Sequence, residues 1–385
     1  MKKVLLGVAA VFACTFAVSG LTSCGSDLGS DWKVAMITDY GDITDESFNQ
    51  ATYEGAKSWC DDNNVEFTYY KPTDNTDAER IKSIELAADN GYNLIIMPGY
   101  AFAPAIDATA EDYPDVKFVA LDVSKGDLLA AHYGAEYNYN PDDPLWAGYV
   151  LPSNLYCAVY QEELAGYMAG YAAVKEGYTK LGFLGGMAVP AVIRYGYGFV
   201  QGCDDAANGA AIEIKYVYGN QFFGDNDITT YVSNWYATGT EVIFACGGGI
   251  YTSAGEAAEN NGGKKVIGVD VDQKATIDGE YGEGTCITSA MKGLSATVKA
   301  KLTEIITEET FVSKIETLGL VSGTDPEENY VQLPTDTWSM TNFTVANYEA
   351  LVEDLFDGTI TVSASIADAP EVATTTSVTY FGNIK

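Results

Sequence analysis

An internal repeat constrains this chain more than any other feature of its sequence. Gly91–Gly99 is matched by Gly239–Gly247, and Lys117–Asp122 by Lys265–Asp270, both at a spacing of about 148 residues. Each segment contains a short apolar run that is typical of a buried parallel strand. Two earlier pairs occur in the same order at nearly the same spacing: Lys33–Met36 with Lys180–Phe183, and Val65–Phe67 with Ile212–Ile214. Four ordered matches predict two copies of one folding unit.

Amphipathic segments of helix length lie between the apolar runs, among them Phe48–Asp62, Ala78–Asn90, Leu164–Lys175 and Tyr251–Glu259. Strands that alternate with helices form parallel sheets covered on both faces, with right-handed crossovers. The sequence therefore predicts an α/β protein with two doubly wound parallel-sheet lobes.

After the second copy, the pattern predicts a helix over Lys292–Thr307, a strand over Tyr330–Leu333 and a helix over Val345–Asp357. We expect the lobes to exchange these late segments, so that several strands cross between them at a hinge. The predicted N-terminal lobe is 32–158 with 288–328, and the predicted C-terminal lobe is 159–287 with 329–385.

The first 31 residues have the features of an export signal. Lys2 and Lys3 precede the apolar run Val4–Ala17, and Leu21–Cys24 resembles the lipobox of bacterial lipoproteins. We expect residues 1–23 to be a signal peptide, Cys24 to carry the lipid and 24–31 to be a tether. The alternative is an uncleaved membrane anchor. Both place the remaining chain outside the cytoplasm.

Composition excludes several classes of function. The chain has 21 Lys and Arg against 54 Asp and Glu, a net charge of −33 that repels nucleic acid. A single histidine, His132, is too few for a His-rich metal site, and we expect it to be an isolated side chain with satisfied hydrogen bonds. The cysteines after Cys24 form no C-x-x-C motif, so we expect them to be buried apolar residues: Cys60, Cys157, Cys203, Cys246 and Cys286. The sequence predicts no metal and no cofactor.

Ligands of open α/β sheets bind beyond the carboxyl ends of the strands, where the first strand leads into Asp39–Gln50. Ser47 and Gln50 have the spacing of a capping box, which would place Phe48 and Asn49 in the first turn of a helix. The acidic loop is interpreted as a ligand contact; a solvated loop or a calcium loop are the alternatives.

Asp122 and Asp270 end the fourth strand of each copy and are expected to face each other across a cleft. They could act as a general acid/base pair, accept hydrogen bonds from vicinal hydroxyls, or cap the next turn. Lys292 is expected in the first turn of its helix, where the dipole disfavours a cation. It would point into the cleft and pair with Asp270, or else face outward.

Aromatic and glycine residues follow other strands of the second copy. Phe222 or Phe223 could stack with Phe48 on a flat ligand, although aromatic pairs belong more often to a core than to a ligand platform. Gly247–Gly249, with Gly248 at its centre, permits a close backbone approach, but no phosphate-binding glycine motif is present in the sequence.

Several of these motifs together resemble the basic membrane protein family, the purine-nucleoside-receptor lipoproteins. They are the lipobox, D-x-G-x-x-x-D-x-S-F-N-Q at Asp39–Gln50, Gly268–Gln273 and Thr288–Lys292. The resemblance implies a type I periplasmic-binding fold that captures a nucleoside and passes it to the permease of an ABC importer. The sequence departs from the family pattern in two places. One is Gln221–Asp225, which leaves open which phenylalanine stacks, and the other is Tyr133–Tyr156.

The resemblance also implies roles for individual residues. Phe48 and Phe223 would stack on the base, while Asn49 and Asp122 would bind its edge. Asp270, Lys292 and a glycine of Gly247–Gly249 would hold the ribose, and Asp39 would support the first loop.

An acidic cleft favours a neutral ligand with hydroxyl groups over a phosphorylated one, so we expect a nucleoside and a monomeric, non-enzymatic receptor. Two alternatives remain open. One is a binding protein of the same fold for a sugar or signalling furanose that acts with a sensor. The other is an exported hydrolase of glycosidic bonds that uses Asp122 and Asp270.

Overall fold

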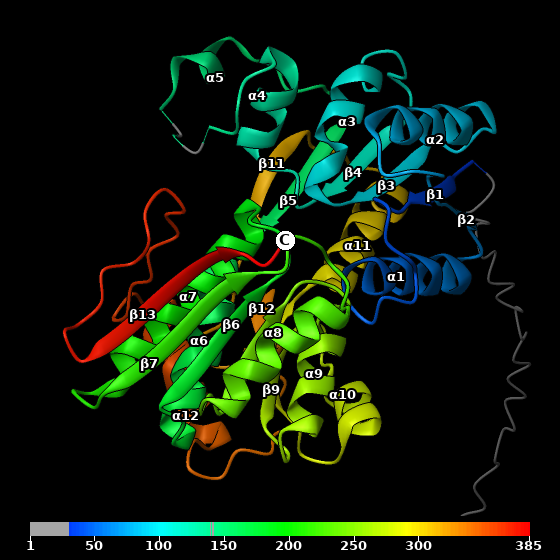
Figure 1. Ribbon diagram of the computed structural model, residues 1–385. Helices are drawn as coiled ribbons and strands as arrows, with labels where there is room; N and C mark the ends of the chain where they lie inside the picture. Colours follow the sequence, from blue (N-terminus) through cyan, green and yellow to red (C-terminus); the bar gives the residue numbers. More distant parts are fainter. Residues whose placement is uncertain (1–30, 139, 141) are drawn as a thin grey trace, which may run out of the picture.

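The computed structural model describes residues 31–138, 140 and 142–385, and it forms two α/β lobes (Figure 1). The predicted signal peptide and the lipid site at Cys24 lie outside these residues. The first lobe has a parallel six-stranded sheet in the order β11-β5-β4-β3-β1-β2. Its strands are β1 (Lys33–Ile37), β2 (Glu66–Tyr70), β3 (Leu94–Pro98), β4 (Lys117–Leu121), β5 (Leu155–Tyr160) and β11 (Lys314–Leu318).

The second lobe has a seven-stranded sheet in the order β12-β10-β9-β8-β6-β7-β13, in which β12 alone is antiparallel to its neighbour. Its strands are β6 (Lys180–Gly185), β7 (Ile212–Tyr218), β8 (Val242–Cys246), β9 (Lys265–Asp270), β10 (Cys286–Lys292), β12 (Val331–Gln332) and β13 (Thr376–Asn383). The order β4-β3-β1-β2 in one sheet corresponds to β9-β8-β6-β7 in the other. The predicted repeat and fold class are therefore confirmed.

Helices cover both faces of each sheet, because successive strand residues point to opposite faces and both faces are apolar. In the first lobe, α1 (Phe48–Asn63) and α11 (Leu294–Leu302) pack on one face. On its other face lie α2 (Asp77–Asp89), α3 (Ala103–Thr109) and α4 (Lys125–Tyr133). In the second lobe, α6 (Glu162–Glu176), α7 (Pro190–Ala207) and α12 (Val345–Phe356) lie opposite α8 (Asn226–Ala237), α9 (Tyr251–Asn260) and α10 (Lys274–Tyr281).

The chain crosses between the lobes after β5, after β10 and between β11 and β12. The expected boundary at 158 falls inside β5, and the one at 287 falls inside β10, so both are corrected. The predicted helix over Lys292–Thr307 also begins too early. Lys292 is the last residue of β10. The helix begins after it, with α11 at Leu294, and ends with the π-helical turn Thr303–Thr307.

Other features refine the expectations. The cysteines Cys60, Cys157, Cys203, Cys246 and Cys286 are buried and free, as predicted.

The segment Tyr133–Tyr156, which departs from the family pattern, contains the short helix α5 (Pro144–Gly148), which projects with α4 at the top of Figure 1. Of the helices in the described ranges, none is long and apolar enough to cross a membrane.

Glycines set the close packing of α6 against α7. A Cβ on Gly166 or Gly170 would collide with backbone carbonyls of α7, and a Cβ on Gly198 or Gly202 would collide with carbonyls of α6. This contact matters for the cleft, because α6 begins with Glu162 and α7 carries Arg194.

Gly202→Ala is expected to lower the free energy of unfolding by about 1–3 kcal/mol, because the helices must separate to admit one methyl group. Gly279→Ala in α10 is the matched control, since its Cβ would meet nothing within 4 Å. That control should gain roughly 0.5–1 kcal/mol from helix propensity. Chemical denaturation measures both values, and equal effects of the two substitutions would contradict the close-packing account.

Candidate functional site

A cavity of about 460 Å³ lies where the carboxyl ends of both sheets meet. Its volume is typical of small-molecule sites. All nine residues singled out from the sequence line it: Asp39, Phe48, Asn49, Asp122, Phe222, Phe223, Gly248, Asp270 and Lys292.

The acidic loop before α1 is organised by its own carboxylates. The Oδ1 atom of Asp39 accepts hydrogen bonds from the backbone N–H groups of Tyr40 and Gly41 and from the side chain of Asn49. Asp42 pairs with Lys71 at 2.7 Å. Asp45 accepts from the backbone N–H groups of Asn49 and Gln50. These oxygens are therefore occupied by donors, and the residues described include no group of three or more His, Cys, Asp or Glu placed to hold a metal ion.

The predicted capping box at Ser47 and Gln50 is wrong, although α1 does begin at Phe48. Asp45 takes the place of the Ser47 side chain because its carboxylate is the stronger acceptor for the free N–H groups of the first turn. The Ser47 hydroxyl is thereby released to donate to Asp270 Oδ2 of the other lobe, at 2.6 Å. One contact between the lobes thus starts at the first helix.

Two buried acceptors on the cavity wall have no hydrogen-bond partner among the residues that the structure describes: Asn49 Oδ1 and Asp122 Oδ1. Asn49 commits its Nδ2 group to Asp39 and Asp45, at 3.2 and 3.0 Å, so its carbonyl oxygen is left over. Burying an acceptor without a donor costs about 1–3 kcal/mol. The cavity is therefore prepared for a ligand that brings hydrogen-bond donors.

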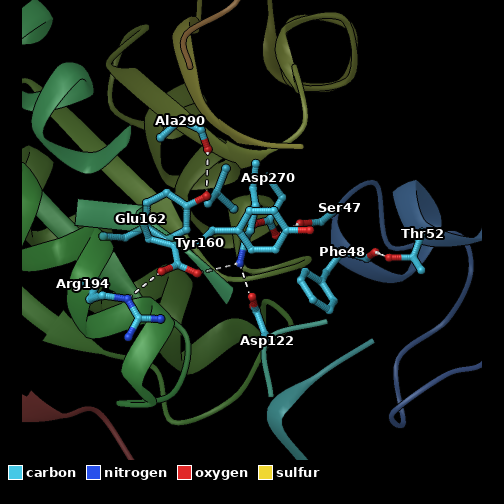
Figure 2. Close-up of polar contacts among 12 residues, drawn as sticks. Ser47, Phe48, Thr52, Asp122, Tyr160, Glu162, Arg194, Asp270 and Ala290 are labelled. Carbon is cyan, nitrogen blue, oxygen red and sulfur yellow. Dashed lines mark hydrogen bonds and ion pairs between the residues drawn. The ribbon is translucent and has the colours of Figure 1, made fainter. Parts of the chain in front are cut away.

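Lys292 connects the two predicted carboxylates instead of facing outward. Its ammonium lies 2.6 Å from Asp122, 3.4 Å from Glu162 and 3.9 Å from Asp270. In Figure 2, dashed lines mark the contacts of Asp122 and Glu162 with this ammonium, and the side chain of Asp270 lies nearby. Since Asp122 belongs to the first lobe and Lys292 ends β10 of the second, the ion pair spans the cleft.

Lys292 is also enclosed by aromatic rings. Its Nζ atom lies 5.0 Å from the ring centroid of Phe48, 5.3 Å from that of Tyr160 and 5.6 Å from that of Tyr195. Its side chain is only 3% exposed. Such contacts stabilise a desolvated ammonium by cation–π attraction and fix its direction.

Burial and charge set the protonation states in this network. Burial lowers the pKa of Lys292, but Asp122, Glu162 and Asp270 outweigh it, and the net pKa is raised. Burial raises the pKa of Asp122 to about 6 despite Lys292, while Glu162 adds to the rise. Burial also raises the pKa of Asp270. Burial acts on Glu162 in the same direction, but Arg194, whose Nε lies 2.6 Å away, and Lys292 hold its pKa below the ordinary value. Glu162 is therefore the permanent counter-ion.

Asp122 and Asp270 occupy equivalent positions of the repeat and have unusual backbone conformations. Both lie in the left-handed region, with φ of 58° and 65°. This conformation is costly for a residue other than glycine and persists only where the surroundings enforce it. The strain turns each carboxylate toward Lys292 at the end of its strand.

The two phenylalanines of the second-lobe loop have different surroundings. Phe222 packs against Gly186 and Gly247, where a Cβ would collide with its ring. Gly248 has φ of 53°, and a Cβ there would press on the carbonyl of Phe222. Phe223 is 56% exposed and forms a bridge with Gly249. Phe223 is therefore free to cover a ligand, and Phe222 anchors the loop.

Some residues of the site were missed by sequence reasoning. They are Tyr100, Ser124, Asp127, Arg194 and Tyr195 on the cavity wall, with Glu162 behind it. Glu162 lies two residues after the end of the crossing strand β5, which is the signal that could have identified it. His132 is paired with Asp107 at 2.8 Å, away from the cavity lining.

Comparisons with known proteins agree with this geometry. Solved structures of ABC transporter solute-binding proteins share the fold. The protein from Aeropyrum pernix K1 is 19% identical with a TM-score of 0.63 and covers 86% of this chain and 87% of its own. The protein from Conexibacter woesei DSM 14684 is 21% identical with a TM-score of 0.64, over 86% of this chain and 99% of its own.

Curated relatives are more similar in sequence. The "ABC transporter nucleoside-binding protein BmpA" of Lactococcus lactis is 29% identical over 71% of this chain and 75% of its own. Basic membrane protein B of Borreliella afzelii is 30% identical over 71% and 75%. The Bmp family model, described as "ABC transporter substrate-binding protein PnrA-like", matches residues 32–325. The chain therefore belongs to the Bmp family of ABC transporter substrate-binding proteins.

Proposed function

We propose that this protein is a lipid-anchored extracytoplasmic receptor that captures a nucleoside, with purines favoured, and delivers it to an ABC importer. The observation that carries the proposal is the content of one cavity. Phe48 and the exposed Phe223 lie in it together with the unpartnered acceptors of Asn49 and Asp122. Two rings suit a flat base, and two acceptors suit an edge with N–H donors.

The other end of the proposed ligand would be a ribose. Asp270 accepts hydrogen bonds from hydroxyl groups, and the ammonium of Lys292 donates to a hydroxyl oxygen. Gly248 lets the backbone approach closely, because it carries no Cβ. These three residues take the roles that the family resemblance implies for them.

Charge on the cavity wall supports a neutral ligand. Among the described residues, the wall has three cations, Lys71, Arg194 and Lys292, and each is already paired with a carboxylate. A phosphate group would meet the negative charge of the wall with no free cation of the described residues to offset it. We therefore infer a preference for nucleosides over nucleotides.

Binding without hydrolysis is the better proposal for Asp122 and Asp270. Both carboxylates face the same ammonium, and Asp270 also accepts from Ser47. A general acid and a nucleophile would need opposite protonation states on either side of a sugar. Release of free base from a nucleoside on incubation would overturn this part of the proposal.

A thermal-shift panel tests the function. Purine and pyrimidine nucleosides, free bases, ribose, hexoses and nucleotides are each added to the purified protein. A nucleoside at 100 times its dissociation constant should stabilise the folded state by about 2.7 kcal/mol, whereas nucleotides should have little effect. If no ligand responds, mass spectrometry of the denatured protein should find a co-purified nucleoside. Stabilisation by hexoses alone, or an empty cavity with no response, would contradict the proposal.

Phe223→Ala should weaken nucleoside binding by about 1–3 kcal/mol, because the exposed ring covers the base. Phe222→Ala is the control: it should lower thermal stability more than affinity, since that ring packs against Gly186 and Gly247. Isothermal titration with the nucleoside and with ribose separates the effects. A larger affinity loss for Phe222→Ala would reverse the assignment.

Affinity should fall as the pH is lowered through about 6, the pKa to which burial raises the Asp122 carboxyl. Above this pH the group is ionised, and Oδ1 is open to N–H donors of the ligand while Oδ2 accepts from Lys292. Below it, the added proton removes part of that accepting capacity. The expected loss approaches tenfold per pH unit. Asp122→Asn should abolish this dependence, and a wild-type affinity that is constant between pH 5 and 8 would show that Asp122 does not bind the ligand.

A further inference from the structure

A segment outside the family match reaches the candidate site. The family model ends at residue 325, but β13 (Thr376–Asn383) adds an edge strand to the second sheet and pairs in parallel with β7. Parallel strands present their carboxyl ends at the same edge of a sheet. The end of β13 therefore emerges beside the loop that follows β7, as the C label in Figure 1 shows.

Residues at the end of β13 contact the strand before this loop and the helix after it. The backbone N–H of Ile384 donates to the carbonyl of Tyr218, the last residue of β7, at 2.9 Å. The ring of Phe381 lies 5.7 Å from that of Trp235 in α8. The segment thus joins the strand before the loop to the helix after it.

The side chain of Lys385 contacts the loop itself. Its ammonium pairs with the carboxylate of Asp225 and lies 3.4 Å from Gln221 Oε1. Asp225 also caps α8 by accepting from the backbone N–H groups of Asp227 and Ile228. Gln221 Nε2 donates to Asp225 at 2.7 Å and to the carbonyl of Phe223 at 2.8 Å. Lys385, Gln221 and Asp225 thus bracket Phe222 and Phe223.

Backbone contacts hold the loop from the other side. The backbone N–H of Gly249 donates to the carbonyl of Phe222 at 2.9 Å, and the Ser253 hydroxyl accepts from the N–H of Asp225 at 2.9 Å and donates to its carbonyl at 3.1 Å. Partial burial acts to raise the pKa of Asp225, but Lys385, the N–H of Ile228 and Gln221 outweigh it and hold the pKa at about 2. The carboxylate therefore stays ionised at any working pH, and the bracket does not open by protonation.

We infer that Lys385 is a positioning residue for ligand binding, which holds Gln221–Asp225 so that Phe223 faces the cavity. Lys385 touches the loop and acts on the ligand only through it. The inference rests on the proposed function, because the loop is taken to cover a base.

Lys385→Ala in the full chain tests this inference. The side chains of Lys385 and Asp225 are 36% and 27% exposed, so the effect is limited by solvent screening. We expect affinity for the nucleoside to fall about threefold, with no change for ribose. Amide hydrogen exchange at residues 219–225 should become faster by a similar factor without any ligand. Lys385→Arg should restore both, and 1 M salt should reduce the difference, because salt screens the ion pair.

Lys33→Ala is the matched control. Its ammonium forms another exposed ion pair, with Glu66 at 2.8 Å, but at the amino end of β1, away from the cleft. It should leave affinity and exchange at 219–225 unchanged.

Two results would overturn the inference: equal exchange at 219–225 in wild type and Lys385→Ala, or faster exchange with unchanged nucleoside affinity. If the wild type binds no nucleoside, the proposed function fails, and equal exchange would separately show that Lys385 does not hold the loop.

Discussion

The buried ammonium of Lys292 is the interaction on which the site depends. Three carboxylates from both lobes converge on it. Glu162 would keep Arg194 if the cation were removed, but Asp122 and Asp270 would be left buried without a counter-ion among the described residues, which typically costs about 3–5 kcal/mol. Glu162, held by Arg194, keeps the ammonium charged, whereas Asp122 and Asp270 have raised pKa values and are the adjustable members. A ligand group that takes the place of Asp122 or Asp270 beside Lys292 would therefore change the contact between the lobes.

The repeat explains why this arrangement can form. Each copy places an aspartate in a left-handed conformation at the carboxyl end of its fourth strand, so the two carboxylates meet from opposite lobes. Lys292, which binds both carboxylates, comes from a segment that crosses between the lobes. Its strand β10 lies in the second sheet, while the next helix, α11, packs on α1 of the first lobe. A single element thus links the site to the hinge, the place where lobe rotation on binding would be controlled.

The sequence predicts the strands and the cavity residues at their carboxyl ends, among them Asp122, Gly248 and Asp270, because buried parallel strands are continuous apolar runs and their carboxyl ends face the cleft. It fails where contacts between distant segments decide the outcome. The spacing of Ser47 and Gln50 suits a capping box, yet Asp45 supplies a better acceptor and Ser47 bonds to Asp270, which is distant in sequence. Glu162 and Arg194 belong to no local sequence motif. The strand β13 follows a polar stretch, and it lacks the continuous apolar run of a central strand.

A crystal structure of the complex with a purine nucleoside would test the central claim most directly. We expect the base to lie between Phe48 and Phe223 with its edge at Asn49 and Asp122, and the ribose hydroxyls to lie within hydrogen-bond distance of Asp270 and Lys292. A ligand bound outside this cavity, or a ribose at Asn49 with the base away from both rings, would contradict it.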